Sequence, residues 1–200
     1  HNVAVKSDGT VWAWGYNHNA ELGQGDRSDR NEPSRVVGIS DAVLATTTHH
    51  GSCIVHRDRT MSCWGYGGHG QNGDGHTSTR ELPVRVQDLT DVDSVSGGVY
   101  HYCAHRRDKS VRCWGYGNYG QTRNQVDNYG YARTPTGVLE IGDVEEVTTG
   151  GYHTCVRKAD AKVYCFGYNN HGEVGQGNTS YRSIGMRQVN NLSDVAEVSG

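Results

Sequence analysis

An aromatic residue followed by glycine and tyrosine recurs four times along the chain at nearly constant spacing. The four copies begin at Trp14, Trp64, Trp114 and Phe166, so successive steps are 50, 50 and 52 residues. A fixed period of this length indicates one supersecondary unit repeated in tandem. The fold must therefore be a stack or a ring of similar units, and a catalytic site would need separate support.

Other landmarks keep the same register over all 200 residues. An aspartate lies six residues before each aromatic residue, at Asp8, Asp58, Asp108 and Asp160, and the three prolines, Pro33, Pro83 and Pro135, share one position of the unit. We therefore predict a single repeat domain over 1–200, with units at about 1–48, 49–98, 99–150 and 151–200. We also expect this domain to be part of a longer chain.

Each unit has the pattern of four short strands. We expect strands over residues such as 92–95, 101–105 and 111–114, and a fourth, marked by proline, through 35–37 or 85–86. Asp8-Gly9 indicates a hairpin turn, and proline suits the outermost strand of a sheet. No stretch shows sustained helical periodicity. Four tandem, four-stranded antiparallel units of about 50 residues predict an all-β fold, the β-propeller.

The strand over 111–114 indicates how the units pack. Val111 and Cys113 point to one face of the sheet, and Arg112 and Trp114 point to the other. In a propeller both faces of an inner strand contact neighbouring sheets. We therefore expect the large aromatic residue of each unit to fill the space between two sheets.

The six cysteines form three pairs with identical spacing: Cys53 and Cys63, Cys103 and Cys113, and Cys155 and Cys165. Nine residues separate the members of a pair, which places them opposite each other in a hairpin. The first unit has Val3 and Ala13 at these positions, so it lacks both thiols together. This pattern favours three disulfides over the alternative of buried free thiols. Disulfides indicate the extracellular space, the cell surface or the periplasm.

A metal site is a less favoured interpretation of the same region. His101, Cys103 and His105 share one face of a strand, but Cys103 already has Cys113 opposite. The second unit carries Gly51 where the histidine recurs, and no four-ligand zinc spacing is present. We predict no metal and no cofactor, and we interpret the repeated histidine as a hydrogen-bonding residue at the start of a strand.

Several segments resemble the regulator of chromosome condensation repeat family. Residues 151–155 (Gly-Tyr-His-Thr-Cys), 14–17 (Trp-Gly-Tyr-Asn) and 21–25 (Glu-Leu-Gly-Gln-Gly) match its unit. The resemblance implies a seven-bladed propeller, of which these four units would be an arc. Four blades that close alone, and several copies that assemble, remain alternatives. A second cysteine just before the Trp-Gly pair resembles the pattern of secreted bacterial members of the family. The best-known activity of the family is guanine nucleotide exchange on a small GTPase.

Charge and hydropathy limit the partners. The formal net charge is −3, which gives no electrostatic reason to expect nucleic acid or an anionic membrane. No apolar run approaches the roughly 20 residues that a membrane span needs. We therefore expect no nucleic acid and no membrane insertion.

The third unit differs most from the others in its loop. Two extra residues lie between Trp114 and Pro135, and the segment combines tyrosine and asparagine as adaptable recognition loops do. The candidate partner-binding residues are Tyr119, Arg123, Asn124, Asn128, Tyr129 and Tyr131. A surface loop that has merely drifted is the alternative.

These observations favour a non-catalytic module that binds a protein or assembles with itself at a cell surface or outside the cell. The alternative from the family resemblance is a guanine nucleotide exchange factor for a small GTPase, which the cysteines and the four units disfavour. A conventional enzyme is not indicated, because no catalytic triad, carboxylate pair or phosphate-binding loop stands out. We infer no catalytic residue and no small-molecule substrate.

Overall fold

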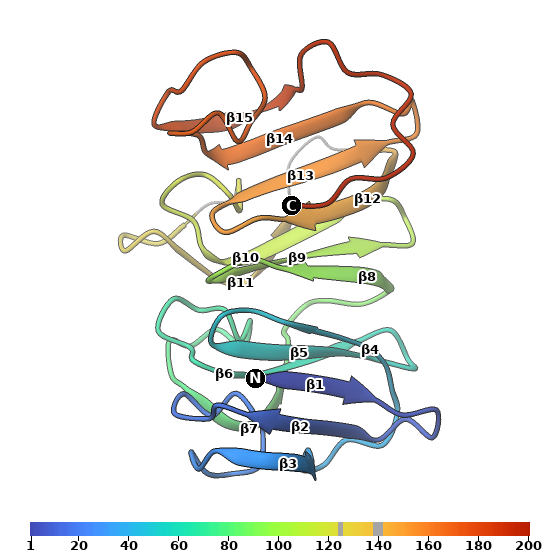
Figure 1. The fold of residues 1–200 in the computed structure, drawn as a ribbon, viewed down its shortest axis with the longest axis vertical. Coiled ribbons are helices and arrows are strands. Elements are labelled where there is room, and N and C mark those ends of the chain that lie inside the picture. Colours follow the sequence, from blue (N-terminus) through green and yellow to red (C-terminus); the bar gives the residue numbers. More distant parts are fainter. Residues whose placement is uncertain (124–125, 138–141) are drawn as a thin grey trace.

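The computed structural model describes residues 1–123, 126–137 and 142–200. Every regular element in these residues is a β-strand, and the strands form four antiparallel sheets (Figure 1). The described residues contain no helix with the length and apolar character that a membrane crossing requires. The all-β prediction is therefore confirmed.

The strands follow one another in chain order within each sheet. The first sheet contains three strands: β1 (Asn2–Val5), β2 (Val11–Gly15) and β3 (Arg30–Arg35). The second contains β4 (Ala42–Thr47), β5 (Gly51–His56), β6 (Met61–Gly65) and β7 (Arg80–Arg85). The third contains β8 (Val92–Gly97), β9 (His101–Arg106), β10 (Val111–Tyr116) and β11 (Tyr131–Gly137). The fourth contains β12 (Val144–Thr149), β13 (His153–Lys158), β14 (Val163–Tyr168) and β15 (Arg182–Gln188).

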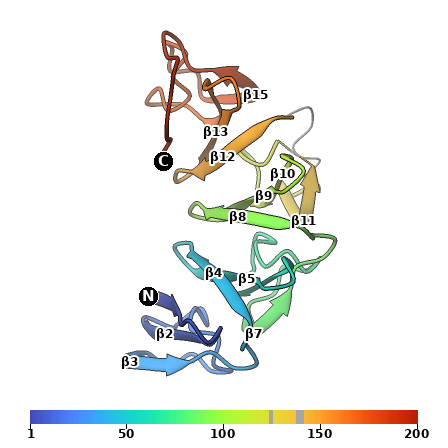
Figure 2. The ribbon, with the colours of Figure 1, turned by 90° about the vertical axis from the view of Figure 1, so that its right-hand side faces the viewer.

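The four sheets succeed one another along the longest axis of the molecule in chain order (Figures 1 and 2). The first strand of each four-stranded sheet precedes the repeated histidine position, so every such sheet takes one strand from the end of the preceding sequence unit. The hairpin turns between β1 and β2 and between β9 and β10 lie at one end of the sheets, on the right in Figure 1. The loops that follow β2, β6, β10 and β14 begin at the opposite end.

The repeated aromatic residue joins neighbouring sheets, as expected. Trp114 of β10 has no exposed surface, and its Nε1 donates a hydrogen bond to the Gln71 carbonyl in the second sheet's loop, at 2.9 Å. Gly73 of that loop has φ +68°, and a Cβ there would lie 3.0 Å from Trp114 Nε1. Glycine therefore allows the loop to approach the indole ring in a conformation that other residues rarely adopt.

The outer strand of each sheet differs from the sequence-based expectation. It covers 30–35 and 80–85 instead of beginning near 35 and 85. The cause is a bulge: Cys63 pairs with Val84 and Gly65 pairs with Arg80, so three residues of β7 lie opposite one residue of β6. Pro83 falls in this bulge on the edge strand, where its missing N–H breaks no regular ladder.

The three predicted disulfides are present. Cys53–Cys63, Cys103–Cys113 and Cys155–Cys165 each join directly opposite residues of a central hairpin, with 4.1 Å between the Cα atoms. Val3 and Ala13 form the corresponding pair in the first sheet. Cys103 and Cys113 pack in a cluster with Val147 and Phe166 of the fourth sheet. Cys53 and Cys63 likewise cluster with Tyr102 and Trp114 of the third sheet, so these two bridges lie in cores shared by two sheets, whereas Cys155 and Cys165 cluster with Val163 and Val174 of their own repeat.

Candidate binding face

A repeated backbone contact brings aromatic side chains together at the loop end of each sheet. The glycine of the aromatic-Gly-Tyr motif has positive φ, and a Cβ on Gly115 would lie 2.4 Å from the Tyr100 carbonyl oxygen. The amide of Tyr116 then donates to that same carbonyl at 2.9 Å. Equivalent bonds join Tyr66 to His50 and Tyr168 to Tyr152. The motif therefore places its tyrosine beside the residue that precedes the repeated histidine position.

These pairs belong to one continuous set of ring contacts across three sheets, which we name the tyrosine–histidine face. Neighbouring ring centroids in this set lie 4.1–6.4 Å apart. Its members are His49, His50, Tyr66, His69, Tyr100, Tyr116, Tyr119, Tyr129, Tyr131, Tyr152, Tyr168, His171 and Tyr181.

His69 fills a box of four tyrosine rings between the second and third sheets. Its ring centroid lies 5.6 Å from Tyr66, 4.9 Å from Tyr100, 5.2 Å from Tyr116 and 4.9 Å from Tyr131. Burial lowers the pKa of His69 because the charged form loses water. The imidazole is therefore neutral at physiological pH.

Tyr119 fills the corresponding box between the third and fourth sheets. Its ring contacts Tyr116, Tyr152, Tyr168 and Tyr181, with centroid distances of 5.6, 5.4, 5.1 and 5.6 Å. A hydrogen bond with the Tyr181 hydroxyl, together with burial, raises the pKa of Tyr119 to about 12. The hydroxyl is consequently neutral, and Tyr119 links two sheets through ring contacts and a hydroxyl hydrogen bond.

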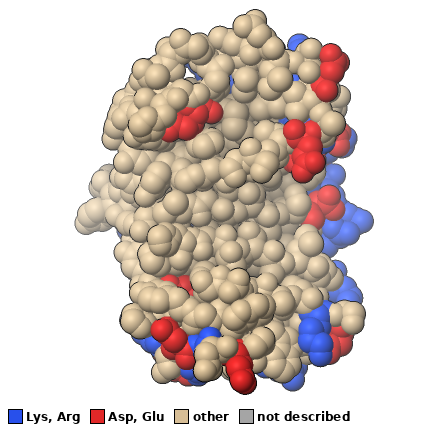
Figure 3. All heavy atoms as spheres, in the orientation of Figure 1, with Lys and Arg blue, Asp and Glu red and all other residues tan. Residues whose placement is uncertain are grey.

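Charged side chains concentrate away from this face. In the space-filling view, Lys, Arg, Asp and Glu gather mainly on the right-hand side, where the hairpin turns lie (Figure 3). The middle of the left-hand side, where the loop after β10 projects, carries almost none. The two ends of the sheets therefore differ in surface chemistry: charged side chains dominate one (Figure 3), and aromatic rings occupy the middle of the other.

Ion pairs fix the loops that carry the rings. Arg80 Nε donates to Asp74 Oδ2 at 2.6 Å, and Arg133 Nε donates to Asp127 Oδ2 at 2.7 Å. Asp127 also accepts the amide of Tyr131 at 3.1 Å, which holds this ring at the edge of the His69 box. Because the loops are already ordered, a partner would meet a surface with little conformational entropy left to lose.

The structure places the predicted loop residues in different surroundings. Tyr119 and Tyr131 are half-buried within the tyrosine–histidine face, and Tyr129 stacks on Tyr131 with 69% of its surface exposed. Asn128 is exposed. Arg123 lies over the Phe166 ring of the fourth sheet, 6.0 Å from its centroid, so it packs between sheets. Asn124 lies outside the described residues.

Sequence reasoning did not identify most of the face. Tyr66, Tyr116 and Tyr168 were visible only as landmarks of the repeat, and Tyr100 and Tyr152 were not singled out. The available signal was the tyrosine count: the chain has 12 tyrosines and one phenylalanine. Such a preference for a ring with a hydroxyl indicates surface use, because a core would accept phenylalanine equally well.

The repeated histidine is a hydrogen-bonding residue at the start of its strand, as predicted. His101 Nε2 lies 3.0 Å from Thr154 Oγ1, and that hydroxyl donates to the Gln121 carbonyl at 2.9 Å. Thr154 must therefore accept from His101, which places the proton on Nε2. His1, Ser52 and Glu21 repeat this arrangement between the first and second sheets.

The possible metal ligands around His101 are engaged elsewhere. Cys103 is bridged to Cys113, and His105 Nε2 donates to the Val144 carbonyl at 2.8 Å. Within the described part of the chain, no group of three or more histidine, cysteine, aspartate or glutamate residues is placed to hold a metal ion.

His101 makes the fold sensitive to acid. Complete burial lowers its pKa to about 3, with a smaller contribution from His153, whereas the unfolded chain titrates near 6.5. Between pH 7 and pH 5 the unfolded state therefore binds a proton that the folded state excludes, and the free energy of unfolding falls as pH falls. We expect His101 to account for about 2 kcal/mol of this loss. Urea unfolding at both pH values should show a smaller difference in His101→Gln, and an unchanged difference would contradict the assignment.

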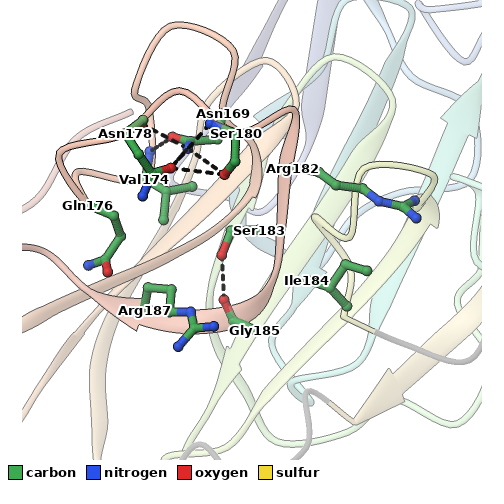
Figure 4. A pocket seen from close by; sticks show the side chains of 10 residues that line it. All are labelled: Asn169, Val174, Gln176, Asn178, Ser180, Arg182, Ser183, Ile184, Gly185 and Arg187. Atoms are coloured by element: carbon green, nitrogen blue, oxygen red, sulfur yellow. Dashed lines mark hydrogen bonds between the residues drawn. The ribbon is translucent and has the colours of Figure 1, made fainter.

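A hollow beside β15 is a second candidate site, and its position in the sheet recurs in the earlier sheets. The pocket has a volume of about 400 Å³, Val174 and Gln176 line it, and the Ser183 hydroxyl donates to the Gly185 carbonyl within it (Figure 4). Gly23 and Gly73 hold the position of Gly175 in earlier sheets, where they contact Trp64 and Trp114. We therefore interpret this hollow as the sheet-to-sheet contact position.

Comparison with known families agrees with this repeat geometry. Residues 8–55 and 63–105 match the family model described as the Regulator of chromosome condensation (RCC1) repeat, and residues 92–121 and 144–173 match a second model of that description. The chain belongs to this repeat family. Its sheets are thus propeller blades, and the four blades form an open arc.

Several solved structures share this fold. Yeast RCC1 (Prp20) bound to Kap60 superposes with a TM-score of 0.83 at 17% identity, over 94% of this chain and 46% of that chain. Prp20p of Saccharomyces cerevisiae, whose binding to Gsp1p and histones was examined, gives 0.80 at 18%, over 94% and 48%. Human WBSCR16 gives 0.81 at 18%, over 96% and 51%. The chain therefore spans about half the length of these three proteins.

Proposed function

We propose that this chain is a non-catalytic module that binds a protein, or assembles with a surface structure, outside the cytosol through its tyrosine–histidine face. The observation that carries the proposal is the connected set of 13 tyrosine and histidine rings that spans three blades. Exposed aromatic clusters of this size are typical of recognition surfaces, where tyrosine contributes large contact area with few torsions to fix.

The order of the face supports recognition of a partner. Ring-to-ring packing and the pairs Asp74–Arg80 and Asp127–Arg133 hold the rings in place before any partner arrives. Yeast RCC1 (Prp20), which shares this fold, was solved bound to a protein, Kap60. A protein of this fold can therefore take part in protein contacts. In this chain, we assign the contact with the partner to the aromatic rings of the tyrosine–histidine face.

The disulfides support a location outside the cytosol. Three bridges in one small arc would be kept reduced by cytosolic thiols, whereas an oxidising compartment preserves them. The extracellular space, the cell surface and the periplasm all meet this requirement.

Guanine nucleotide exchange on a small GTPase is the competing function. Family membership suggests this function, and so does yeast Prp20p, whose binding to Gsp1p was examined. It would require a reducing compartment and blades beyond these four, so the disulfides weigh against it. A nucleotide-release assay with a small GTPase such as Gsp1p separates the two: accelerated release by this chain would overturn the non-catalytic proposal.

The test of the proposed function is capture of a partner by matched variants. The oxidised chain, immobilised, would be exposed to the secreted and surface proteins of its own cells. Tyr129→Ala with Tyr181→Ala removes two rings that are 69% and 57% exposed, so the fold should survive. We expect these changes to lower the affinity for a specific partner at least tenfold, as the loss of aromatic anchors does.

Trp12→Ala provides the control for this capture. Trp12 is a partly exposed aromatic residue of β2, and its Nε1 donates to the Thr10 hydroxyl at the opposite end of the sheet. We expect the control to retain the partner. Equal retention by the double variant and the control would mean that the tyrosine–histidine face is not the contact surface.

A further inference from the structure

Tyrosine, and not phenylalanine, forms the surface rings of this chain. Nine of its 12 tyrosines belong to the tyrosine–histidine face, whereas the single phenylalanine, Phe166, is fully buried. A tyrosine presents an apolar ring and a polar hydroxyl to the same ligand. Sugar rings have matching chemistry, because one side of a hexose carries C–H groups and its edge carries hydroxyls.

We propose that the tyrosine–histidine face binds a neutral, extended carbohydrate chain, either a free polysaccharide or a glycan on a partner protein. The inference deepens the proposed function and uses the same face. It assigns sugar rings to the exposed parts of the aromatic rings, and sugar hydroxyls to the tyrosine hydroxyls around them.

A cationic ligand fits the face poorly. Four aromatic rings around a cavity would form a cage for a quaternary ammonium group or a methylated lysine. Here the box of Tyr66, Tyr100, Tyr116 and Tyr131 already contains the His69 ring, at 4.9–5.6 Å. The second box is filled by a tyrosine in the same way. A ligand must therefore lie across the rings and not inside a cage.

An anionic ligand or a nucleic acid also fits poorly. Single-stranded nucleic acids need aromatic stacking together with a positively charged groove. Two arginines beside the boxes are neutralised, because Arg80 is paired with Asp74 and Arg133 with Asp127. Arg182, beside Tyr181, has no carboxylate partner among the ion pairs of the described residues, but its guanidinium already donates to the Asn118 carbonyl at 2.8 Å. Stacking surface with so little available positive charge favours an uncharged ligand.

The spacing of the rings favours an extended ligand. The residues that precede the repeated histidine position are His50, Tyr100 and Tyr152, one from each of three successive blades. Their ring centroids are 6.1 and 6.4 Å apart, and all three are half-buried, so each keeps part of its surface in solvent. This regular step is close to the advance of one hexose along an extended chain, so successive sugars could meet successive blades.

The proposal is tested with defined probes on the oxidised chain. Cellohexaose, laminarin, mannan and chitohexaose represent neutral carbohydrates, heparin an anionic one, and a polyproline peptide the other ligand class that docks on aromatic rows. Titration calorimetry should detect binding of at least one neutral carbohydrate. Tyr181→Ala should weaken that binding roughly threefold to tenfold, Tyr181→Phe should weaken it less, and Trp12→Ala should leave it unchanged.

Each contrary result is decisive. The proposal is overturned if none of the neutral carbohydrates binds, if Tyr181→Ala and Tyr129→Ala leave binding unchanged, if heparin alone binds, or if polyproline alone binds in a Tyr181-dependent way. Ribonuclease B and ribonuclease A, which share a protein and differ in one neutral glycan, separate the two sources: binding of B but not A indicates a protein-linked glycan. A captured protein that still needs Tyr181 after deglycosylation would overturn the carbohydrate inference and leave the proposed function standing.

Discussion

Replacing Trp114 by alanine is expected to lower the free energy of unfolding by about 3–5 kcal/mol, the range seen when large buried aromatic residues are truncated. The ring has no exposed surface and packs in a cluster with Leu89, Val92 and Tyr102. Its loss would leave a cavity between two blades and would strip the Gln71 carbonyl of the indole donor. Equilibrium unfolding in urea measures the change.

Trp14 is the matched control for this experiment. It occupies the same repeat position in the first blade, but it is only half-buried and lines a surface hollow with His1 and Thr46. Because less apolar area is removed from water, Trp14→Ala should cost about 1–2 kcal/mol. If both substitutions cost the same, the stability of Trp114 comes from its own sheet, and the account of blades sealed by their neighbours is wrong.

The period of the sequence predicted most of the fold because each landmark has a local physical cause. The glycine after each aromatic residue is needed where the chain passes a carbonyl oxygen, as at Gly65 and Gly115. Asp8 accepts hydrogen bonds from the Thr10 amide and hydroxyl and so closes its hairpin turn. Requirements of this kind act within a few residues, so they are visible in the sequence.

The sequence-based prediction begins the outer strands too far along the chain, because their register depends on a bulge. Nothing in the residues around Pro83 shows that three residues of β7 lie opposite Trp64. The proline identified an edge strand correctly, but its position within that strand is set by pairing with β6, which is a property of the assembled sheet.

The candidate site was the least predictable part, since its residues come from different blades. His69 reaches its box only when Tyr100 and Tyr131 of the next blade are in place, about 30 and 60 residues along the chain. Repetition also hid the site, because the tyrosine of the aromatic-Gly-Tyr motif served only as a landmark of the period. In a repeat protein a periodic exposed residue can instead form a surface, because the fold multiplies it across blades.

Removing one disulfide is expected to cost about 2–3 kcal/mol, since each bridge closes a loop of some ten residues in the unfolded chain; this figure follows from the chain-entropy account. The first blade supplies the replacement: Val3 and Ala13 form the same cross-strand pair without sulfur. Cys103→Val with Cys113→Ala should therefore lose the bridge while keeping an apolar pair in the shared core. Urea unfolding of the oxidised proteins gives the difference.

Reduction distinguishes the bridge from the packing of the cysteine side chains. Reductant should destabilise the wild-type chain by more than it destabilises the double variant, because the variant retains only two of the three bridges. The intact mass of the oxidised wild type should also be six hydrogens below its reduced mass, two for each bridge. Six free thiols in the native protein, with the same unfolding curve before and after reduction, would remove the argument for an oxidising compartment and return nucleotide exchange to consideration.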